Sequence, residues 1–260
     1  MFLRKIFTAE NKLAWVVIDL LIVIIGVYCA FLIQEYAAQE KTKQEKEEVI
    51  SALKYELEFF RILMPGRAWY SNNQTQSWEK MRQGGRYIDY SNWRFVEPQY
   101  KYQMLEYALQ VQNREVINFE LYQTSQLVYE QIRRIEHTES IITELGMRYQ
   151  SYPEGLSETS ESYKLIYAKN MDNFSRLINT MKLRGEDQGL LAERATSALI
   201  LINEILSPDT RKRIEQDLII QYIGDMVDTE EEAVMGVRES FPNFEEDEIR
   251  EMYRTATKSE

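Results

Sequence analysis

The sequence predicts an all-α protein, in which one N-terminal transmembrane helix continues into a stalk helix and then into a soluble helical bundle. Residues 13–33 form a run of 21 positions in which only Asp19 is charged. Helix breakers are few, because only 5 prolines and 10 glycines occur among 260 residues, and apolar residues recur at helical spacing. No stretch of useful length alternates between apolar and polar residues as a strand would.

The run at residues 13–33 is long enough to cross a membrane, since about 20 residues at about 1.5 Å rise each cover the ~30 Å hydrocarbon core. A cleaved signal peptide is the alternative, but its apolar core would be only about 7–15 residues long. Cleavage after Ala30 would also place the bulky Tyr28 where a small residue is required. We therefore expect an uncleaved anchor.

The orientation of this anchor follows from the basic residues beside it. Basic residues lie on both sides: Arg4, Lys5 and Lys12 before the run, and Lys41, Lys43 and Lys46 after it. The first group is denser and nearer to the lipid, which favours a cytoplasmic N-terminus. The C-terminal part of the chain is then expected outside the cytoplasm.

Composition and motifs limit the function. The chain has a net charge of −11 and no basic stripe, which argues against nucleic acid as a partner. No motif for a nucleotide, a metal or a nucleophilic active site is present. The only histidine, His137, has no cysteine or second histidine beside it, so we expect a structural or surface role. The sequence therefore predicts no enzyme activity, no cofactor and no metal site.

The predicted organisation has five parts. They are a short flank at 1–12, the transmembrane helix at 13–35, a stalk and first bundle helix at 36–64, a bundle domain at 65–228, and acidic short helices or a tail at 229–260. Pro65 and Gly66 are predicted to end the first bundle helix. The inward face of that helix is expected to carry Val49, Leu53, Leu57, Phe60 and Met64.

Breakers and apolar spacing predict further helices in the bundle. They are expected at residues 70–82, 99–112 and 119–149, from Ser157 or Thr159 to Gly185, and at 191–205 and 214–226. Pro153-Glu154-Gly155 is predicted to form a loop, and Ser207-Pro208-Asp209 is predicted to break the chain.

Three of the four tryptophans, Trp69, Trp78 and Trp93, lie within residues 67–98. Aromatic side chains are mostly buried, so the cluster is expected to contact the bundle core. The other interpretation is a ligand cage or a surface groove. If the domain has a groove, we expect it at these tryptophans.

Asp19 is the one residue of the apolar run that needs a chemical explanation. A carboxylate near the bilayer interior costs about 2.5–3.5 kcal/mol, so it is a candidate functional site. Asp19 shares a helix face with Gly26 and Ala30, a small-xxx-small pair that lets another backbone approach. Asp19 could hydrogen-bond to another helix, or it could relay ions. The face predicts association, with a second copy as a homodimer or with a multi-span membrane partner.

Two resemblances rest on these residues. The segments WVVIDLLIVIIGVYCAFLIQEY and EKEEVISALKYELEF resemble the N-terminus of a group of uncharacterised bacterial proteins with a GEIxLVxIGIxIAL-like span. Asp19 falls where that group has an acidic residue, and Gly26 and Gln34 fit its motif. VINFELYQTSQLVYEQI is similar to a segment of their extracytoplasmic domains. The resemblance implies a bacterial inner-membrane protein with a periplasmic domain, and no known activity.

The span is also similar to the single-span subunits of proton-driven motors of the MotB, ExbD and TolR kind. That resemblance implies that Asp19 carries protons, although residues 67–260 look helical and unlike the periplasmic domains of those proteins. The first functional hypothesis is a membrane-anchored interaction or scaffold protein. The alternative is an ion-translocating subunit of a motor complex that uses Asp19. A third hypothesis, a sensor, requires a pocket in the aromatic region.

Overall fold

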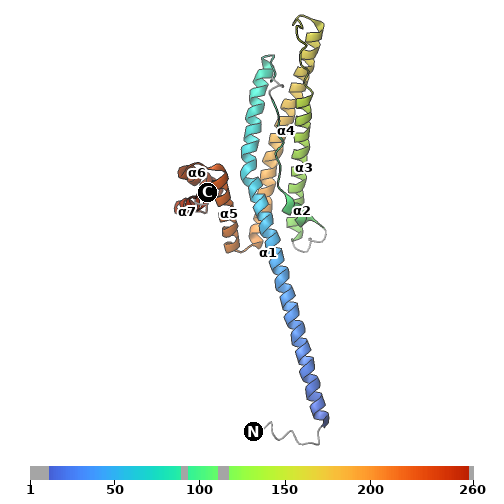
Figure 1. Ribbon diagram of the computed structural model, residues 1–260, viewed down its shortest axis with the longest axis vertical. Coiled ribbons are helices and arrows are strands. Elements are labelled where there is room, and N and C mark those ends of the chain that lie inside the picture. Colours follow the sequence, from blue (N-terminus) through green and yellow to red (C-terminus); the bar gives the residue numbers. More distant parts are fainter. Residues whose placement is uncertain (1–11, 89–92, 111–116, 258–260) are drawn as a thin grey trace. The chain divides into compact units, whose positions relative to one another are not determined.

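The computed structural model describes residues 12–88, 93–110 and 117–257, with the side chains of 12–19, 225 and 226 left outside the description. In these ranges, all regular secondary structure is α-helix, which confirms the all-α prediction. The helices are α1 (Lys12–Gln83), α2 (Gln103–Leu109), α3 (Phe119–Met147), α4 (Glu161–Ile205), α5 (Pro208–Met226), α6 (Glu230–Ser240) and α7 (Glu246–Ala256). Figure 1 labels them along the chain.

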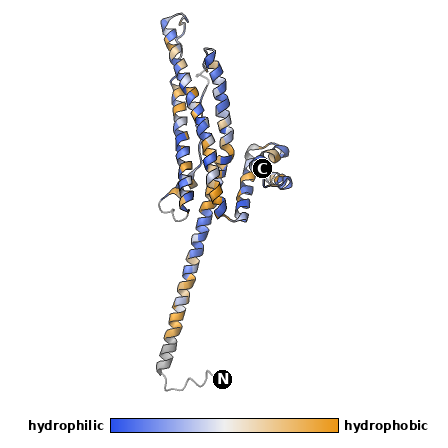
Figure 2. Ribbon diagram, turned by 180° about the vertical axis from the view of Figure 1, so that it is seen from behind, coloured by the Kyte–Doolittle hydropathy of each residue, from blue (hydrophilic) through white to orange (hydrophobic). Residues whose placement is uncertain are grey.

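The chain divides into two units, residues 1–48 and 49–260. In the first unit, the described part of α1 is exposed on every side over residues 20–33, where the side chains are predominantly apolar (Figure 2). The helix is long and apolar enough to cross a membrane. A water-filled environment would make such an apolar surface unfavourable, because exposed apolar area costs free energy.

The second unit is a helical bundle with a small helical group beside it. Its part of α1 runs alongside α3 and α4, and α5, α6 and α7 lie on one side of α1 (Figure 1). Two hydrophobic clusters hold it together. The main core contains Leu53, Leu57 and Phe60 of α1 together with apolar residues of α2 to α7. The second core contains Trp78 of α1, Ile142 of α3 and Phe174 of α4.

The predicted end of the first bundle helix at Pro65 is wrong. Helix α1 passes through Pro65 and continues to Gln83, so the separate helix expected at 70–82 is its last part. A proline inside a helix costs about 3 kcal/mol, but the inward stripe continues on both sides of it. Met64, Ala68 and Trp78 are all buried, and their burial offsets the lost hydrogen bond.

The predicted helix end at Gly185 is also wrong. Helix α4 runs without a break from Glu161 to Ile205, which joins two helices that the sequence separated. Gly185 has no positive φ, so it does not act as a C-terminal cap. A Cβ built on it would lie 3.2 Å from the Cβ of Ser71 and 3.4 Å from the carbonyl oxygen of Ala68. This glycine therefore allows α1 and α4 to approach closely.

Other predictions agree with the structure. The inward stripe of α1 is confirmed, since Leu53, Leu57, Phe60 and Met64 are fully buried and Val49 is partly buried against the core. Helix α3 lies where a helix was expected, and short helices α6 and α7 occupy the acidic C-terminal region. Helix α5 begins at Pro208, six residues before its expected start at residue 214, because Pro208 is the first residue of the helix rather than part of a break. Residues 153–155 form a loop, in which Gly155 has a φ of 75°. Several buried residues of α6 and α7 belong to the main core.

Helix α2 is shorter than the predicted helix at 99–112. Residues 93–102 are not helical, and α2 begins at Gln103. The carboxylate of Glu56 in α1 accepts hydrogen bonds from the backbone N–H groups of Met104 at 2.8 Å and Leu105 at 2.9 Å. The side chain of Glu56, which belongs to another helix, thus accepts the hydrogen bonds that an N-cap residue would otherwise accept. The expected C-terminal end of this helix falls in residues 111–116, outside the described residues.

Candidate functional site

The predicted association face lies on the apolar part of α1. Gly26 and Ala30 are exposed, and a Cβ built on Gly26 would meet nothing within 4 Å. Asp19 belongs to the same helix, but its side chain is outside the described residues. Because Gly26 has no side chain, a second helix backbone can approach closely at this position.

The three tryptophans do not form one cage. Trp69 is 67 % exposed, whereas Trp78 is 2 % exposed and belongs to the second core. Trp78 and Trp93 face each other edge-on, with ring centroids 5.7 Å apart. Both line a groove of about 440 Å³ that Trp69 does not reach. The structure therefore places two of the three at a groove, and Trp78 is part of the core as well.

The charged residues of this groove were not predicted from the sequence. Arg67, Arg94 and Arg184 line it together with the two tryptophans. The signal for Arg184 was present, since it continues the buried stripe of α4 three residues after Met181. Because a helix end was predicted at Gly185, Arg184 was not recognised as part of this buried stripe. Arg67 and Arg94 gave no signal, because they come to the groove only through the packing of α1 against the segment at 93–98.

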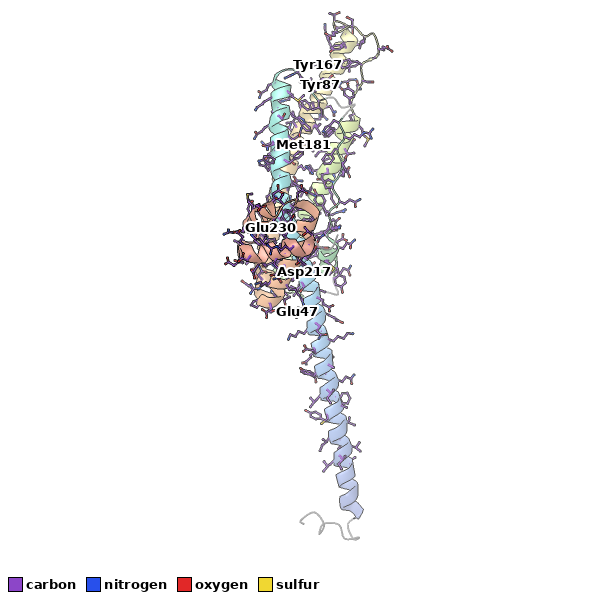
Figure 3. All side chains as sticks on the ribbon, turned by 60° about the vertical axis from the view of Figure 1, so that its left-hand side comes forward. Glu47, Tyr87, Tyr167, Met181, Asp217 and Glu230 are labelled. Carbon is purple, nitrogen blue, oxygen red and sulfur yellow. The ribbon has the colours of Figure 1, made fainter. Side chains whose placement is uncertain are left out.

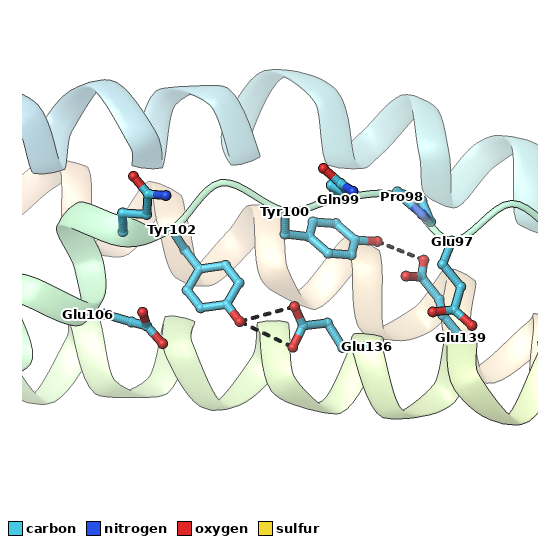
Figure 4. A pocket seen from close by; sticks show the side chains of 9 residues that line it. Glu97, Pro98, Gln99, Tyr100, Tyr102, Glu106, Glu136 and Glu139 are labelled. Carbon is cyan, nitrogen blue, oxygen red and sulfur yellow. Dashed lines mark hydrogen bonds between the residues drawn. The ribbon is translucent and has the colours of Figure 1, made fainter.

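A second hollow, of about 550 Å³, is lined by residues of the non-helical segment at 97–102, by Glu106 and by two residues of α3, and four of its lining residues are glutamates (Figure 4). Tyr100 donates its hydroxyl proton to Oε1 of Glu139 at 2.7 Å. Tyr102 donates to the carboxylate of Glu136 at 3.1 Å. Glu97 accepts from the hydroxyl of Thr143, and Glu106 accepts from the hydroxyl of Tyr129.

Each of the four carboxylates that line this hollow accepts a hydrogen bond from a side chain of the domain itself. Burial raises the pKa of Glu139, and the nearby Arg184 opposes that rise. Burial and the negative charge of Glu139 raise the pKa of Tyr100 to about 12. Tyr100 therefore stays a hydrogen-bond donor near neutral pH. In the part of the chain that the structure describes, no group of three or more metal-ligating side chains is arranged to hold an ion.

Glu139 and Arg184 belong to a polar layer inside the bundle. Arg184 donates from Nη1 to the hydroxyl oxygen of Ser71 at 2.9 Å, so residues of α1, α3 and α4 meet there. Asp187 of α4, buried one turn away, accepts from Gln131 of α3 at 3.0 Å. Such paired groups specify how helices align, because a shift in register would leave buried charges unpaired.

A second buried ionic group ties α1 to α5. Lys54 is fully buried, and its Nζ donates to Glu58 and to Glu215, each at 2.9 Å. Glu58 also accepts from Arg61 at 2.6 Å. Two cations thus meet two carboxylates, which compensates the charge of a lysine that is removed from water.

Several tyrosines lie close together near the N-terminal end of α4. The hydroxyl of Tyr167 donates to the carbonyl oxygen of Gly85 at 2.7 Å, and the rings of Tyr87 and Tyr167 lie 5.9 Å apart (Figure 3). The hydroxyls of Tyr87 and Tyr152 are 2.6 Å apart. These contacts stabilise the turn at Gly85, whose φ of 66° favours glycine. His137 is exposed on α3, as the sequence predicted.

Comparison with known proteins finds no match for this chain among protein families, curated proteins or solved structures.

Proposed function

We propose that this chain is a single-span protein of a bacterial inner membrane, with its N-terminus in the cytoplasm and its helical domain in the periplasm. The domain acts as an interaction or scaffold module. The observation that carries this proposal is the surface of α1, where residues 20–33 are apolar and exposed in every direction. Lipid is the environment that makes such a surface favourable.

Two further features support a scaffold role. The face of α1 that carries Gly26 and Ala30 suits helix association, so we propose a homodimer or a complex with a multi-span partner. In the domain, the buried charges of Lys54, Glu139 and Arg184 are compensated by partners of the fold itself. Groups used in this way maintain a rigid shape, which a scaffold needs.

Membrane insertion and orientation can be tested together. Cys29 is the only cysteine, so a Cys29→Ser variant provides a background for single cysteines. In that background, Thr159→Cys, at an exposed position of a loop, should react with a membrane-impermeant maleimide on intact spheroplasts. Leu3→Cys should react only after lysis. Release of the protein by alkaline carbonate would contradict the anchor, and the reverse labelling pattern would contradict the orientation.

The association face can be tested by substitution in native membranes. Gly26→Leu should reduce the cross-linked dimer, or the yield of a co-purified membrane partner, because the larger side chain keeps backbones apart. Gly224→Leu is the matched control, since Gly224 is exposed in the other unit and a Cβ there meets nothing within 4 Å. Equal yields from both variants would contradict association through this face.

The alternative function is an ion-translocating subunit, and the position of Asp19 within the apolar helix favours it. Asparagine can still hydrogen-bond but cannot exchange a proton. Asp19→Asn should therefore preserve association if the residue only contacts another helix. Loss of function with association intact, together with a stoichiometric multi-span partner, would favour the motor hypothesis instead.

A further inference from the structure

The groove at Trp78 and Trp93 combines a size and a lining that small-molecule sites share. Its volume of about 440 Å³ lies within the roughly 300–1,000 Å³ of typical ligand pockets. One wall is formed by α1, a second by Met181 and Arg184 of α4, and the third by the segment at 93–98. Figure 3 labels Met181 on the α4 side.

Aromatic rings form the apolar part of the groove. Trp93 stacks on Phe95 with an interplanar angle of 28°, and Trp78 meets Trp93 edge-on. Trp78 is held in place by the second core, where its ring lies 5.9 Å from that of Phe174. The guanidinium group of Arg184 lies over the ring of Phe95, 5.1 Å from its centroid. A ligand ring is therefore expected beside Trp93, because aromatic pairs add attraction to the burial of apolar area.

All charged side chains that line the groove are cationic, and its neutral polar lining comes from Tyr70 and Gln74. Arg67, Arg94 and Arg184 line it, and no carboxylate does. The neighbouring hollow has the opposite lining, with four glutamates. In a chain of net charge −11, three guanidinium groups around one groove make a local site that attracts anions.

The guanidinium groups differ in how far the fold already compensates them. Arg184 is paired with Glu139 at 2.7 Å. Arg67 contacts the ring face of Tyr100, but its Nη1 is buried and has no hydrogen-bond partner among the described residues. Within that same part of the chain, Arg94 forms no ion pair with a carboxylate and is exposed. Buried donors without an acceptor are rare in folded proteins, but the positive charge of Arg67 still acts on Glu139, whose pKa it lowers. Arg94 is therefore the guanidinium group of the groove that the described carboxylates compensate least.

We propose that this groove binds a small aromatic carboxylate, whose ring lies beside Trp93 and whose carboxylate lies towards Arg67 and Arg94. A carboxylate accepts charge-assisted hydrogen bonds from guanidinium groups in two-pronged geometry. The ligand ring would bury apolar area of the half-buried Trp93, since Trp78 is already buried in the second core. This site is independent of the membrane role of α1, because all of its residues belong to the unit at 49–260.

Calorimetric titration of the full chain in detergent micelles tests the proposal, with a titration into empty micelles as the blank. The probe is phenylacetate, and phenylacetamide is its uncharged counterpart of the same shape. Phenylacetate should bind about tenfold more tightly than the amide, because only the acid forms charge-assisted hydrogen bonds. Acetate, which lacks the ring, should give no measurable heat. Equal affinity for acid and amide, or no binding of phenylacetate at millimolar concentration, would overturn the proposal.

Variants locate the site. Arg94→Gln should weaken phenylacetate binding about threefold, as expected for an exposed charge, and Arg67→Gln should weaken it about tenfold. Arg176→Gln is the control, since Arg176 is exposed on α4 and pairs with Asp172 outside the groove. If Arg67→Gln unfolds, Arg94→Glu tests the site instead, because reversing the charge should weaken phenylacetate binding more than Arg94→Gln does. Unchanged affinity in both Arg94 variants would place any binding elsewhere and overturn the assignment.

Discussion

The Nε of Arg184 donates to Oε1 of Glu139 at 2.7 Å, and both side chains are buried at the point where the two hydrophobic cores of the bundle meet. Along α3, Glu139 lies between Ile135 of the main core and Ile142 of the second core. The pair thus marks one level of the bundle, and it fixes the alignment of α3 against α4.

Removing one partner of this pair should destabilise the domain strongly. Arg184→Met leaves the buried carboxylate of Glu139 without its cation, and such a loss typically costs about 3–5 kcal/mol. Urea denaturation followed by circular dichroism measures the change in free energy of unfolding. Arg176→Met is the control, because its exposed pair with Asp172 should contribute less than about 1 kcal/mol. Similar losses in the two variants would contradict a special role for the buried pair.

The raised pKa of Glu139 predicts a definite pH dependence. Burial raises this pKa above its ordinary value of 4.5, so the folded state binds the proton more tightly than the unfolded state does. The contribution of Glu139 to stability should therefore improve as the pH falls from neutrality through the raised pKa towards 4.5. Measured by urea denaturation at several pH values, the stability difference between the native chain and Glu139→Gln should shift in favour of the native chain on acidification.

Glu230 provides the opposite case as a control. A hydrogen bond from Arg250 lowers the pKa of Glu230 below 4.5. Its contribution is present above 4.5 and is lost as the pH falls through the lowered pKa. The difference between the native chain and Glu230→Gln should thus shrink on acidification. The same direction of change for Glu139 and Glu230 would contradict the assignment of the two pKa shifts.

Two glycines of α4 should respond in opposite ways to alanine. At Gly189 a new Cβ meets nothing within 4 Å, so Gly189→Ala should stabilise the helix by about 1 kcal/mol. At Gly185 the new Cβ meets Ser71 at 3.2 Å and Asn72 Oδ1 at 2.8 Å. Gly185→Ala should therefore destabilise the domain, by about 1 kcal/mol net, because overpacking outweighs the gain in helix propensity. Thermal unfolding distinguishes them, and equal stabilisation by both would show that α1 does not approach α4 so closely.

The cap that Glu56 places on α2 can be tested by truncation. Glu56→Ala removes the acceptor for the backbone N–H groups of Met104 and Leu105, and the loss of a cap costs about 0.5–2 kcal/mol. Hydrogen exchange should show faster exchange of those two amides. Glu130→Ala, at an exposed position of α3, should leave their exchange unchanged. Slow exchange in Glu56→Ala would mean that another group caps the helix.

Local patterns were sufficient for much of this fold. Apolar residues at helical spacing identified α3 and the inward face of α1, because a helix that buries one side must repeat its apolar residues every three to four positions. The apolar run of the first unit was equally evident, since its length and composition alone meet the requirement for a membrane span. Breakers were reliable where a loop is exposed, as at Gly155.

Inside the bundle, residues that usually end a helix did not do so. Pro65 and Gly185 both disfavour a helix locally, and packing reversed both effects. At Pro65, burial on either side offsets the missing hydrogen bond, and at Gly185 the lack of a side chain makes a close helix contact feasible. These contacts lie far apart in the sequence, so no local pattern contains them.

Local sequence patterns were enough to predict that the chain is helical and that one segment is apolar enough to cross a membrane, because both properties depend on residues that are neighbours along one helix. The continuity of the helices and the pairing of charged side chains could be seen only in the folded domain. The groove is the clearest example: Trp78 and Trp93 were recognisable as a cluster, but Arg67, Arg94 and Arg184 gather beside them only when α1, α4 and the segment at 93–98 come together. Contacts between distant segments depend on the packing of the whole domain, so their chemistry appears only in three dimensions.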